Sequence, residues 1–162
     1  MEYFESAVVG ITGGIGTGKS TVAQIIAEMG YPMISTDAIA KEIMLTDKKV
    51  ISEIKSAFGN EAYNEDGSPN TKFIAEAVFS NSADADARLL VLNSIVHPPV
   101  IEQLSDMVAA LEDEGKEIIF VESALIFESG IEEDFNFIIT VDAPEEAVVA
   151  RVSERSGLSR EQ

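Results

Sequence analysis

Residues 7–20 read AVVGITGGIGTGKS and carry the strongest structural signal in the chain. The continuous apolar run 7–12 stops at glycines, a pattern typical of a strand that is buried on both faces in a parallel sheet. Residues 13–20 match the pattern G-x-x-x-x-G-K-[ST], and apolar residues at helical spacing follow over 22–29. A strand, a glycine-rich loop and a helix in this order predict a P-loop, in which backbone N–H groups and a helix N-terminus surround a phosphate.

The P-loop predicts that the chain binds ATP together with Mg²⁺. Lys19 is placed to reach the β and γ phosphates, and the Ser20 hydroxyl is a hard oxygen ligand suited to Mg²⁺. The chain has no guanine-reading Asn/Thr-Lys-x-Asp pattern, which argues against a GTPase switch. Thr21 borders the loop and fits helix packing better than a second metal ligand. The residues expected around the nucleotide are Gly13, Gly14, Ile15, Gly16, Thr17, Gly18, Lys19, Ser20 and Thr21.

The rest of the chain predicts an α/β fold with a parallel sheet and a helical insertion. Further buried strands are expected at 31–35, 116–121 and 136–141, with helices starting at Asp37 and near residue 144. No strand is evident between 48 and 114. Helices are expected there at 50–58, 71–79, 84–96 and 98–111, with a polar turn at 64–70. We therefore expect a core of residues 1–47 and 115–153, interrupted by a helical insertion at 48–114.

The composition excludes several classes of protein. The chain has 11 Lys and Arg against 29 Asp and Glu, so its net charge of −18 disfavours binding to nucleic acid or to an anionic membrane surface. The absence of cysteine excludes a disulfide framework, a thiolate zinc site and a cysteine nucleophile. The apolar stretches near the N-terminus are too short to span a bilayer, and residues 1–6 carry two Glu where a signal peptide has basic residues. We expect a soluble, cytoplasmic protein.

Two acidic residues at strand ends each allow two interpretations. Asp37 follows the second strand, at the edge where ligands bind in open α/β sheets. Its carboxylate could accept the proton of an attacking hydroxyl, or it could be the N-cap of the helix that follows, and the spacing leaves both open. Glu122 ends the apolar run 118–121, where it could lie near Mg²⁺ or instead face solvent or Lys116.

Five segments of the chain resemble, in order, the motifs of the dephospho-CoA kinase family. They are residues 10–21 (GITGGIGTGKST), 35–41 (STDAIAK), 92–98 (LNSIVHP), 122–128 (ESALIFE) and 155–162 (RSGLSREQ). The resemblance covers essentially the whole chain. It implies a three-layer α/β/α P-loop kinase that transfers the γ phosphate of ATP to the ribose 3′-hydroxyl of dephospho-CoA, which is the final step of coenzyme A synthesis.

The resemblance also implies roles for individual residues. Asp37 would take the proton of the 3′-hydroxyl, and the helical insertion would bind the CoA precursor. A lid would begin at residues 154–162, and because family members continue beyond it, we expect a C-terminal part to be missing from this sequence. The family's Asp-Ala-Asp is here Ser35-Thr36-Asp37, its Arg is here Lys41, and Ala124 stands in place of Pro. Lys41 keeps the positive charge but loses the two-pronged donor of Arg.

The remaining candidates are a histidine, an aromatic residue and the arginines. His97, the only histidine, fits a structural or substrate-binding role better than direct chemistry, and Phe127 could line the acceptor pocket or belong to the core. Three of the four arginines lie in the last twelve residues. We expect Arg155 to screen the charge of the transferring phosphate. Arg151 fits a helix face paired with Glu145, Glu146 and Glu154.

The sequence thus predicts an ATP- and Mg²⁺-dependent kinase of dephospho-CoA. Two alternatives stay open: a P-loop kinase for another nucleotide or small alcohol, and a nucleotide-binding fragment without catalysis. Turnover with different acceptors distinguishes these possibilities. The oligomeric state cannot be read from the sequence.

Overall fold

The computed structural model describes residues 6–80, 84–127 and 130–156 of the chain. They form two compact units, the first drawn from residues 1–37 and 106–162 and the second from residues 38–105. The second unit therefore starts and ends earlier than the insertion expected at 48–114. It starts earlier because the later part of the helix at Thr36–Thr46 packs within it: Ile39 and Ile43 are buried, and the Tyr63 hydroxyl donates a hydrogen bond to the Met44 carbonyl at 2.8 Å.

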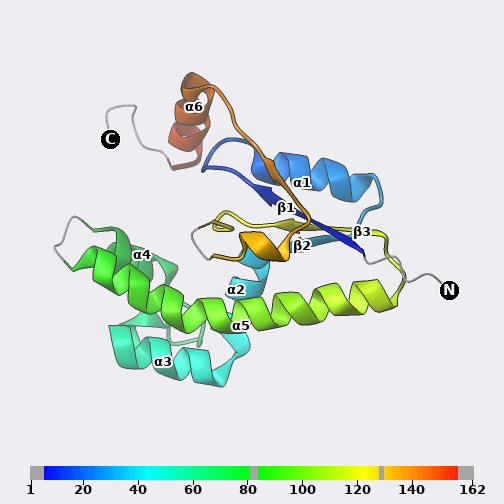
Figure 1. The fold of residues 1–162 in the computed structure, drawn as a ribbon. Helices are drawn as coiled ribbons and strands as arrows, with labels where there is room; N and C mark the ends of the chain where they lie inside the picture. Colours follow the sequence, from blue (N-terminus) through cyan, green and yellow to red (C-terminus); the bar gives the residue numbers. More distant parts are fainter. Residues whose placement is uncertain (1–5, 81–83, 128–129, 157–162) are drawn as a thin grey trace. The chain divides into compact units, whose positions relative to one another are not determined.

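The first unit is built on a parallel sheet of four strands in the order β2-β3-β1-β4 (Figure 1). All four predicted strands are confirmed, and their ends lie within two residues of the sequence prediction. The strands are β1 (Ala7–Thr12), β2 (Met33–Ser35), β3 (Ile118–Glu122) and β4 (Phe137–Thr140). Because parallel strands need crossover connections, the ends of β1, β2 and β3 meet at one edge of the sheet. The α/β fold expected from the sequence is therefore present.

Aliphatic side chains on β1, β2 and β3 form the core of this unit. Ile11, Ile34, Ile119 and Val121 are all at most 2% exposed, as expected for strands that are covered on both faces. Helix α1 (Lys19–Glu28) contacts β1, β2 and β3 and lies beside the sheet in Figure 1. Helix α6 (Glu145–Ser156) follows β4, and acidic residues occupy its first turn, where they are favoured by the helix dipole. The core thereby fixes the loop between β1 and α1.

The second unit is helical, as predicted. Its elements are the later part of α2 (Thr36–Thr46), α3 (Lys48–Phe58), the short 3-10 helix η1 (Asn60–Ala62), α4 (Thr71–Phe79) and most of α5 (Ala85–Asp113). Asp47 caps α3 by accepting hydrogen bonds from the backbone N–H groups of Lys49 and Val50, and Asn70 caps α4 in the same way through Phe73. No helix in the described ranges combines the length and apolar character needed to cross a membrane.

Helix α5 corrects one sequence prediction. The two helices expected at 84–96 and 98–111 are a single helix that runs through Pro98 and Pro99. Each proline removes one intrahelical hydrogen bond, but its fixed φ lies close to the helical value. Val96, Val100 and Leu104 lie one turn apart and are all buried, so the packing of this stripe holds the helix together across the prolines.

Candidate active site

The loop between β1 and α1 is held in shape by glycines at two tight positions. Gly16 has a φ of 79°, and a Cβ there would lie 2.9 Å from Cγ2 of Val152 on α6. A Cβ on Gly13 would lie 2.3 Å from the Val141 carbonyl oxygen. The Thr17 hydroxyl donates to the Gly14 carbonyl at 2.8 Å and closes the turn. The backbone therefore curls in the way that the sequence pattern predicts.

Helix α1 begins directly after this loop, at Lys19. The first N–H groups of a helix have no acceptor in a preceding turn, so those of Lys19 and Ser20 are available to a ligand. They also lie at the positive end of the helix dipole. The loop and the helix start together therefore favour an anion, and a phosphate in particular.

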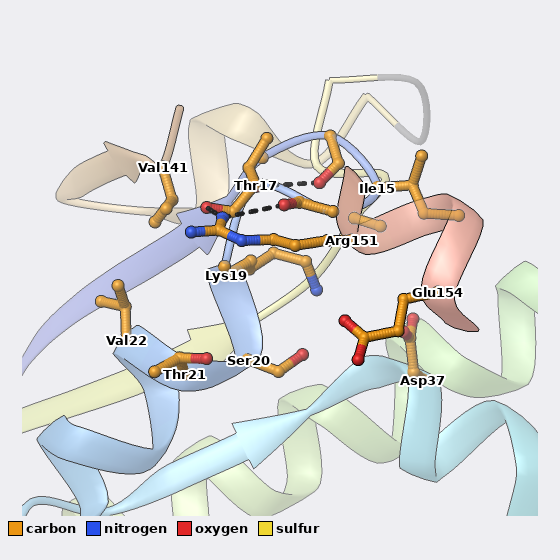
Figure 2. A pocket seen from close by; sticks show the side chains of 15 residues that line it. Ile15, Thr17, Lys19, Ser20, Thr21, Val22, Asp37, Val141, Arg151 and Glu154 are labelled. Atoms are coloured by element: carbon orange, nitrogen blue, oxygen red, sulfur yellow. Dashed lines mark hydrogen bonds between the residues drawn. The ribbon is translucent and has the colours of Figure 1, made fainter. Parts of the chain in front are cut away.

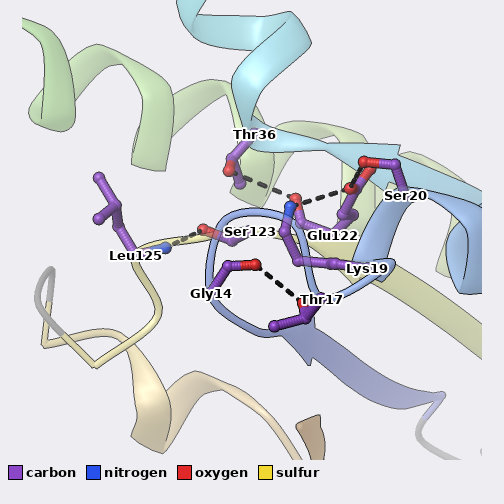
Figure 3. Close-up of polar contacts among 8 residues, drawn as sticks. All are labelled: Gly14, Thr17, Lys19, Ser20, Thr36, Glu122, Ser123 and Leu125. Atoms are coloured by element: carbon purple, nitrogen blue, oxygen red, sulfur yellow. Dashed lines mark hydrogen bonds and ion pairs between the residues drawn. The ribbon is translucent and has the colours of Figure 1, made fainter. Parts of the chain in front are cut away.

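Glu122 connects the loop to the end of β3 (Figure 3). Its Oε1 atom accepts hydrogen bonds from Lys19 Nζ at 2.9 Å and from the Ser20 hydroxyl at 2.8 Å. The Lys19 and Glu122 side chains are 10% and 13% exposed, so this ion pair is largely shielded from solvent. The suggestion that Glu122 faces solvent or Lys116 is wrong, since the ammonium group of Lys116 lies 4.0 Å from Glu114 instead.

The ionisation of Glu122 follows from these contacts. Burial raises the pKa of the carboxyl group, whereas the hydrogen bonds from Lys19 and Ser20 and the charge of Lys19 lower it, and the net result is a pKa below the ordinary value. Glu122 is therefore a carboxylate at neutral pH. It offers a negative oxygen beside the Ser20 hydroxyl, the pair of hard oxygen atoms that the sequence predicted for Mg²⁺.

A pocket of about 760 Å³ opens above the loop, large enough for a nucleotide (Figure 2). Side chains from α1, α2 and α6 surround it, and it contains every residue predicted to contact the nucleotide. Its lining consists of Gly13, Gly14, Ile15, Gly16, Thr17, Gly18, Lys19, Ser20, Thr21, Val22, Asp37, Ala124, Val141, Arg151 and Glu154. The geometry thus brings the P-loop and Asp37 to the same cavity.

Asp37 lies in the first turn of α2 and has an exposed side chain. The helix begins one residue earlier, at Thr36, so the structure does not support the N-cap interpretation of Asp37. Among the described residues, no group donates a hydrogen bond to its carboxylate. The preceding Thr36 is buried, and its hydroxyl donates to the Glu122 carbonyl oxygen at 3.3 Å. Asp37 therefore presents a carboxylate to the pocket, and no described residue donates to its acceptor oxygens.

Arg151 lies against the P-loop and lines the pocket. It was expected to pair with glutamates on its own helix, but it forms no ion pair within the described part of the chain. Its Nη1 atom instead donates to the carbonyl oxygens of Gly16 at 3.0 Å and Thr17 at 3.2 Å. A guanidinium group at this position adds positive charge to a pocket in a strongly acidic protein. The clustering of arginines near the end of the sequence was the available signal, but it does not say which one faces the loop.

Lys41, His97 and Phe127 are not among the residues that line this pocket. Lys41 and His97 belong to the second unit; Lys41 is exposed, and burial lowers the pKa of His97. Phe127 follows β3 and is 56% exposed, so it is not a core residue, and it does not line the pocket described above. The backbone of Arg155 lies in α6, and its side chain is outside the described residues, as are residues 157–162 of the lid expected at 154–162.

Comparison with known proteins identifies the family. Residues 7–162 match the model of the dephospho-CoA kinase family, which covers almost the whole chain. The chain belongs to the dephospho-CoA kinase family. This result confirms the resemblance found in the sequence motifs and the P-loop kinase fold that the resemblance implies.

Individual relatives agree with this membership. The chain is 40% identical to the dephospho-CoA kinase of Chlorobaculum tepidum over 96% of its length and 74% of the relative. It is 37% identical to that of Dehalococcoides mccartyi over 96% of its length and 76% of the relative. Among solved structures, TT1252 from Thermus thermophilus has a TM-score of 0.77 at 36% identity, covering 97% of this chain and 76% of that one. The dephospho-CoA kinase of Campylobacter jejuni has a TM-score of 0.62 at 26% identity, covering 96% and 75%.

Proposed function

We propose that this family member transfers the γ phosphate of ATP to the ribose 3′-hydroxyl of dephospho-CoA, giving coenzyme A and ADP. The observation that carries the proposal is that a complete P-loop and the carboxylate of Asp37 line one pocket. A kinase needs both parts, because one holds the donor phosphates and the other orients the attacking hydroxyl.

The loop and its cationic neighbours bind the triphosphate. Backbone N–H groups at the start of α1 face the β and γ phosphates, and Lys19 exchanges its contact with Glu122 for one with a phosphate oxygen. Arg151, which already lies against the carbonyl groups of the loop, adds a second positive charge, and Arg155 on the same helix screens charge as the phosphoryl group moves. Positive groups fixed in a shielded pocket stabilise the transition state without having to reorganise during the reaction.

The residues around the loop fit Mg²⁺. The Ser20 hydroxyl and Glu122 Oε1 lie 2.8 Å apart and are both hard oxygen ligands. No group of three or more acidic or histidine side chains suited to a metal occurs in the described ranges, and Mg²⁺ at nucleotide sites generally uses few protein ligands, with phosphate and water completing its shell. We propose Ser20 and Glu122 as the residues that hold it. When bound, Mg²⁺ neutralises negative charge on the β and γ phosphates.

Asp37 acts on the acceptor in this proposal. Its carboxylate accepts the proton of the 3′-hydroxyl while the hydroxyl oxygen forms a bond to the γ phosphorus. The bond between that phosphorus and the β–γ bridging oxygen breaks, and ADP leaves with the electron pair. The carboxylate is suited to this task because no described residue occupies its acceptor oxygens.

The second unit and the segment after β3 are proposed to bind the acceptor. The support is the family resemblance of the segments that contain Lys41, His97 and Phe127. Lys41 supplies a positive charge for the acceptor's phosphates, and Phe127 supplies an exposed apolar surface. Because ATP and dephospho-CoA are both charged, water-soluble molecules, we further propose that the reaction takes place in the cytoplasm.

An acceptor panel tests the proposed function. ADP release from Mg·ATP is measured with dephospho-CoA, adenosine, AMP or shikimate as the acceptor, and without any acceptor. We expect release to rise with dephospho-CoA alone. Stimulation by another acceptor would overturn the acceptor assignment and leave the P-loop kinase intact, whereas ATP binding without any acceptor-dependent turnover would favour a non-catalytic nucleotide-binding chain.

A further inference from the structure

Glu122 is the point where three segments of the first unit meet. Its side chain accepts hydrogen bonds from Lys19 and Ser20 of the P-loop, and its backbone carbonyl oxygen accepts a hydrogen bond from the Thr36 hydroxyl at 3.3 Å (Figure 3). Thr36 directly precedes Asp37. A single residue of β3 therefore contacts the groups proposed for donor binding and the first residue of the helix that carries the proposed base.

The start of α2 follows a short strand of the first unit. Strand β2 is three residues long, and its pairing with β3 ends at Ser35 opposite Glu122. The next residue, Thr36, is the first residue of α2, and its hydroxyl makes one further hydrogen bond to β3. The hydroxyl is buried with its residue, which is 8% exposed, so water cannot readily replace this hydrogen bond.

Asp37 follows the hydrogen-bonded Thr36 directly in the chain. None of the described residues donates a hydrogen bond to the Asp37 carboxylate, so the backbone of the first turn of α2 determines where it lies. A reacting group that is misplaced by about 1 Å can lose about a hundredfold in rate. Small movements of this turn should therefore affect the chemical step much more than they affect the binding of ATP, which relies on the loop.

We propose that Thr36 is a positioning residue for phosphoryl transfer. Its hydroxyl joins the first turn of α2 to the Glu122 carbonyl through a hydrogen bond. This bond holds the Asp37 carboxylate at a fixed position relative to Lys19 and Ser20. The proposal rests on the proposed function, specifically on the role of Asp37 as the base. It assigns no contact with substrate to Thr36 itself.

The test compares three variants of the full chain. Thr36→Val removes the hydroxyl and keeps the branched shape, Thr36→Ser keeps the hydroxyl, and Thr46→Val is the matched control. Thr46 lies at the other end of the same helix, and its hydroxyl also donates to a backbone carbonyl, that of Glu42, at 2.8 Å. For each variant, kcat and KM for ATP are measured with dephospho-CoA, and folding is checked by thermal unfolding. If the valine variant gives no folded protein, Thr36→Ala takes its place.

The expected pattern separates positioning from a general loss of structure. Thr36→Val should lower kcat about tenfold while KM for ATP changes by less than about twofold, and Thr36→Ser should restore most of the rate. Thr46→Val should leave both constants unchanged. An unchanged kcat in Thr36→Val, or a loss that extends equally to ATP binding, would overturn the proposal.

A double variant separates this proposal from the one on which it rests. If Thr36 acts through Asp37, adding Thr36→Val to Asp37→Asn should cause no further loss of kcat. A full, additive loss in the double variant would refute the positioning role while leaving the base assignment intact. Normal turnover in Asp37→Asn alone would instead refute the base assignment, and with it the premise for Thr36.

Discussion

Replacing Glu122 with Gln should destabilise the fold in a manner that depends on pH. The substitution keeps the shape of the side chain and an oxygen that can accept hydrogen bonds from Lys19 and Ser20. It removes the negative charge of the acceptor in these two hydrogen bonds, which are 2.9 and 2.8 Å long. A hydrogen bond to a charged group contributes about 1.5–3 kcal/mol, against about 0.5–1.5 kcal/mol for a neutral one. Since the carboxylate also loses favourable hydration by burial, we expect a net loss of about 1–2 kcal/mol in the free energy of unfolding at pH 7.

The contribution of the Glu122 charge to the free energy of unfolding should depend on pH. The pKa of Glu122 is lower in the folded protein than its ordinary value, because the contacts with Lys19 and Ser20 outweigh burial. The stabilisation is therefore fully present above the ordinary pKa of the carboxyl group and is lost as the pH falls through its lower, folded-state pKa. Wild type and Glu122→Gln should differ at pH 7, and the difference should shrink as the pH is lowered below about 4.

Urea unfolding of both proteins across this pH range measures the effect. Glu117→Gln is the matched control, because Glu117 is an exposed carboxylate just before the same strand. It should leave the free energy of unfolding unchanged at every pH. A Glu122→Gln variant as stable as wild type at pH 7, or one whose deficit stays constant down to acid pH, would show that the charge of Glu122 does not stabilise the folded protein.

Three further substitutions probe the site. Asp37→Asn should lower kcat about 10²–10⁴-fold with little change in the Kd for ATP, and near-normal turnover would exclude a base at this position. Gly16→Ala should lower the free energy of unfolding by about 2 kcal/mol, because Gly16 has a positive φ and the Val152 side chain lies close to it. Gly14→Ala should have a much smaller effect, because a Cβ at Gly14 would meet only Thr17, at 3.6 Å. Equal effects of the two substitutions in urea unfolding would contradict the loop geometry. Arg151→Met should weaken ATP binding by about tenfold in calorimetry, and an unchanged Kd would remove Arg151 from the phosphate site.

The strands and the P-loop could be predicted because their signals are local. An apolar run that stops at glycines, followed by Gly18, Lys19, Ser20 and a helical pattern, predicts a P-loop from one short stretch of sequence. The joining of the two predicted helices into α5 could not be predicted in this way. Pro98 and Pro99 weaken a helix locally, and only the burial of Val96 and Val100, a tertiary effect, shows that the helix continues.

The side chains that complete the site depend on packing between distant segments. Arg151 reaches the loop because α6 packs on Gly16, a contact between residues far apart in the sequence. The partner of Glu122 could not be chosen from the sequence either. The pairing of β1 with β3 places Glu122 opposite Ile11, next to the loop that carries Lys19, and this pairing joins residues far apart in the sequence. Local patterns thus predict which residues carry chemistry, and the sheet decides which of them meet.

The identity of the product tests directly whether the chain phosphorylates dephospho-CoA. The chain is incubated with Mg·ATP and dephospho-CoA, and coenzyme A, ADP and inorganic phosphate are quantified together by mass spectrometry and phosphate assay. Transfer to the 3′-hydroxyl predicts coenzyme A and ADP in equal amounts with no accumulation of phosphate. ADP that appears with inorganic phosphate instead of coenzyme A would show that water is the acceptor and would contradict the proposed transfer to dephospho-CoA.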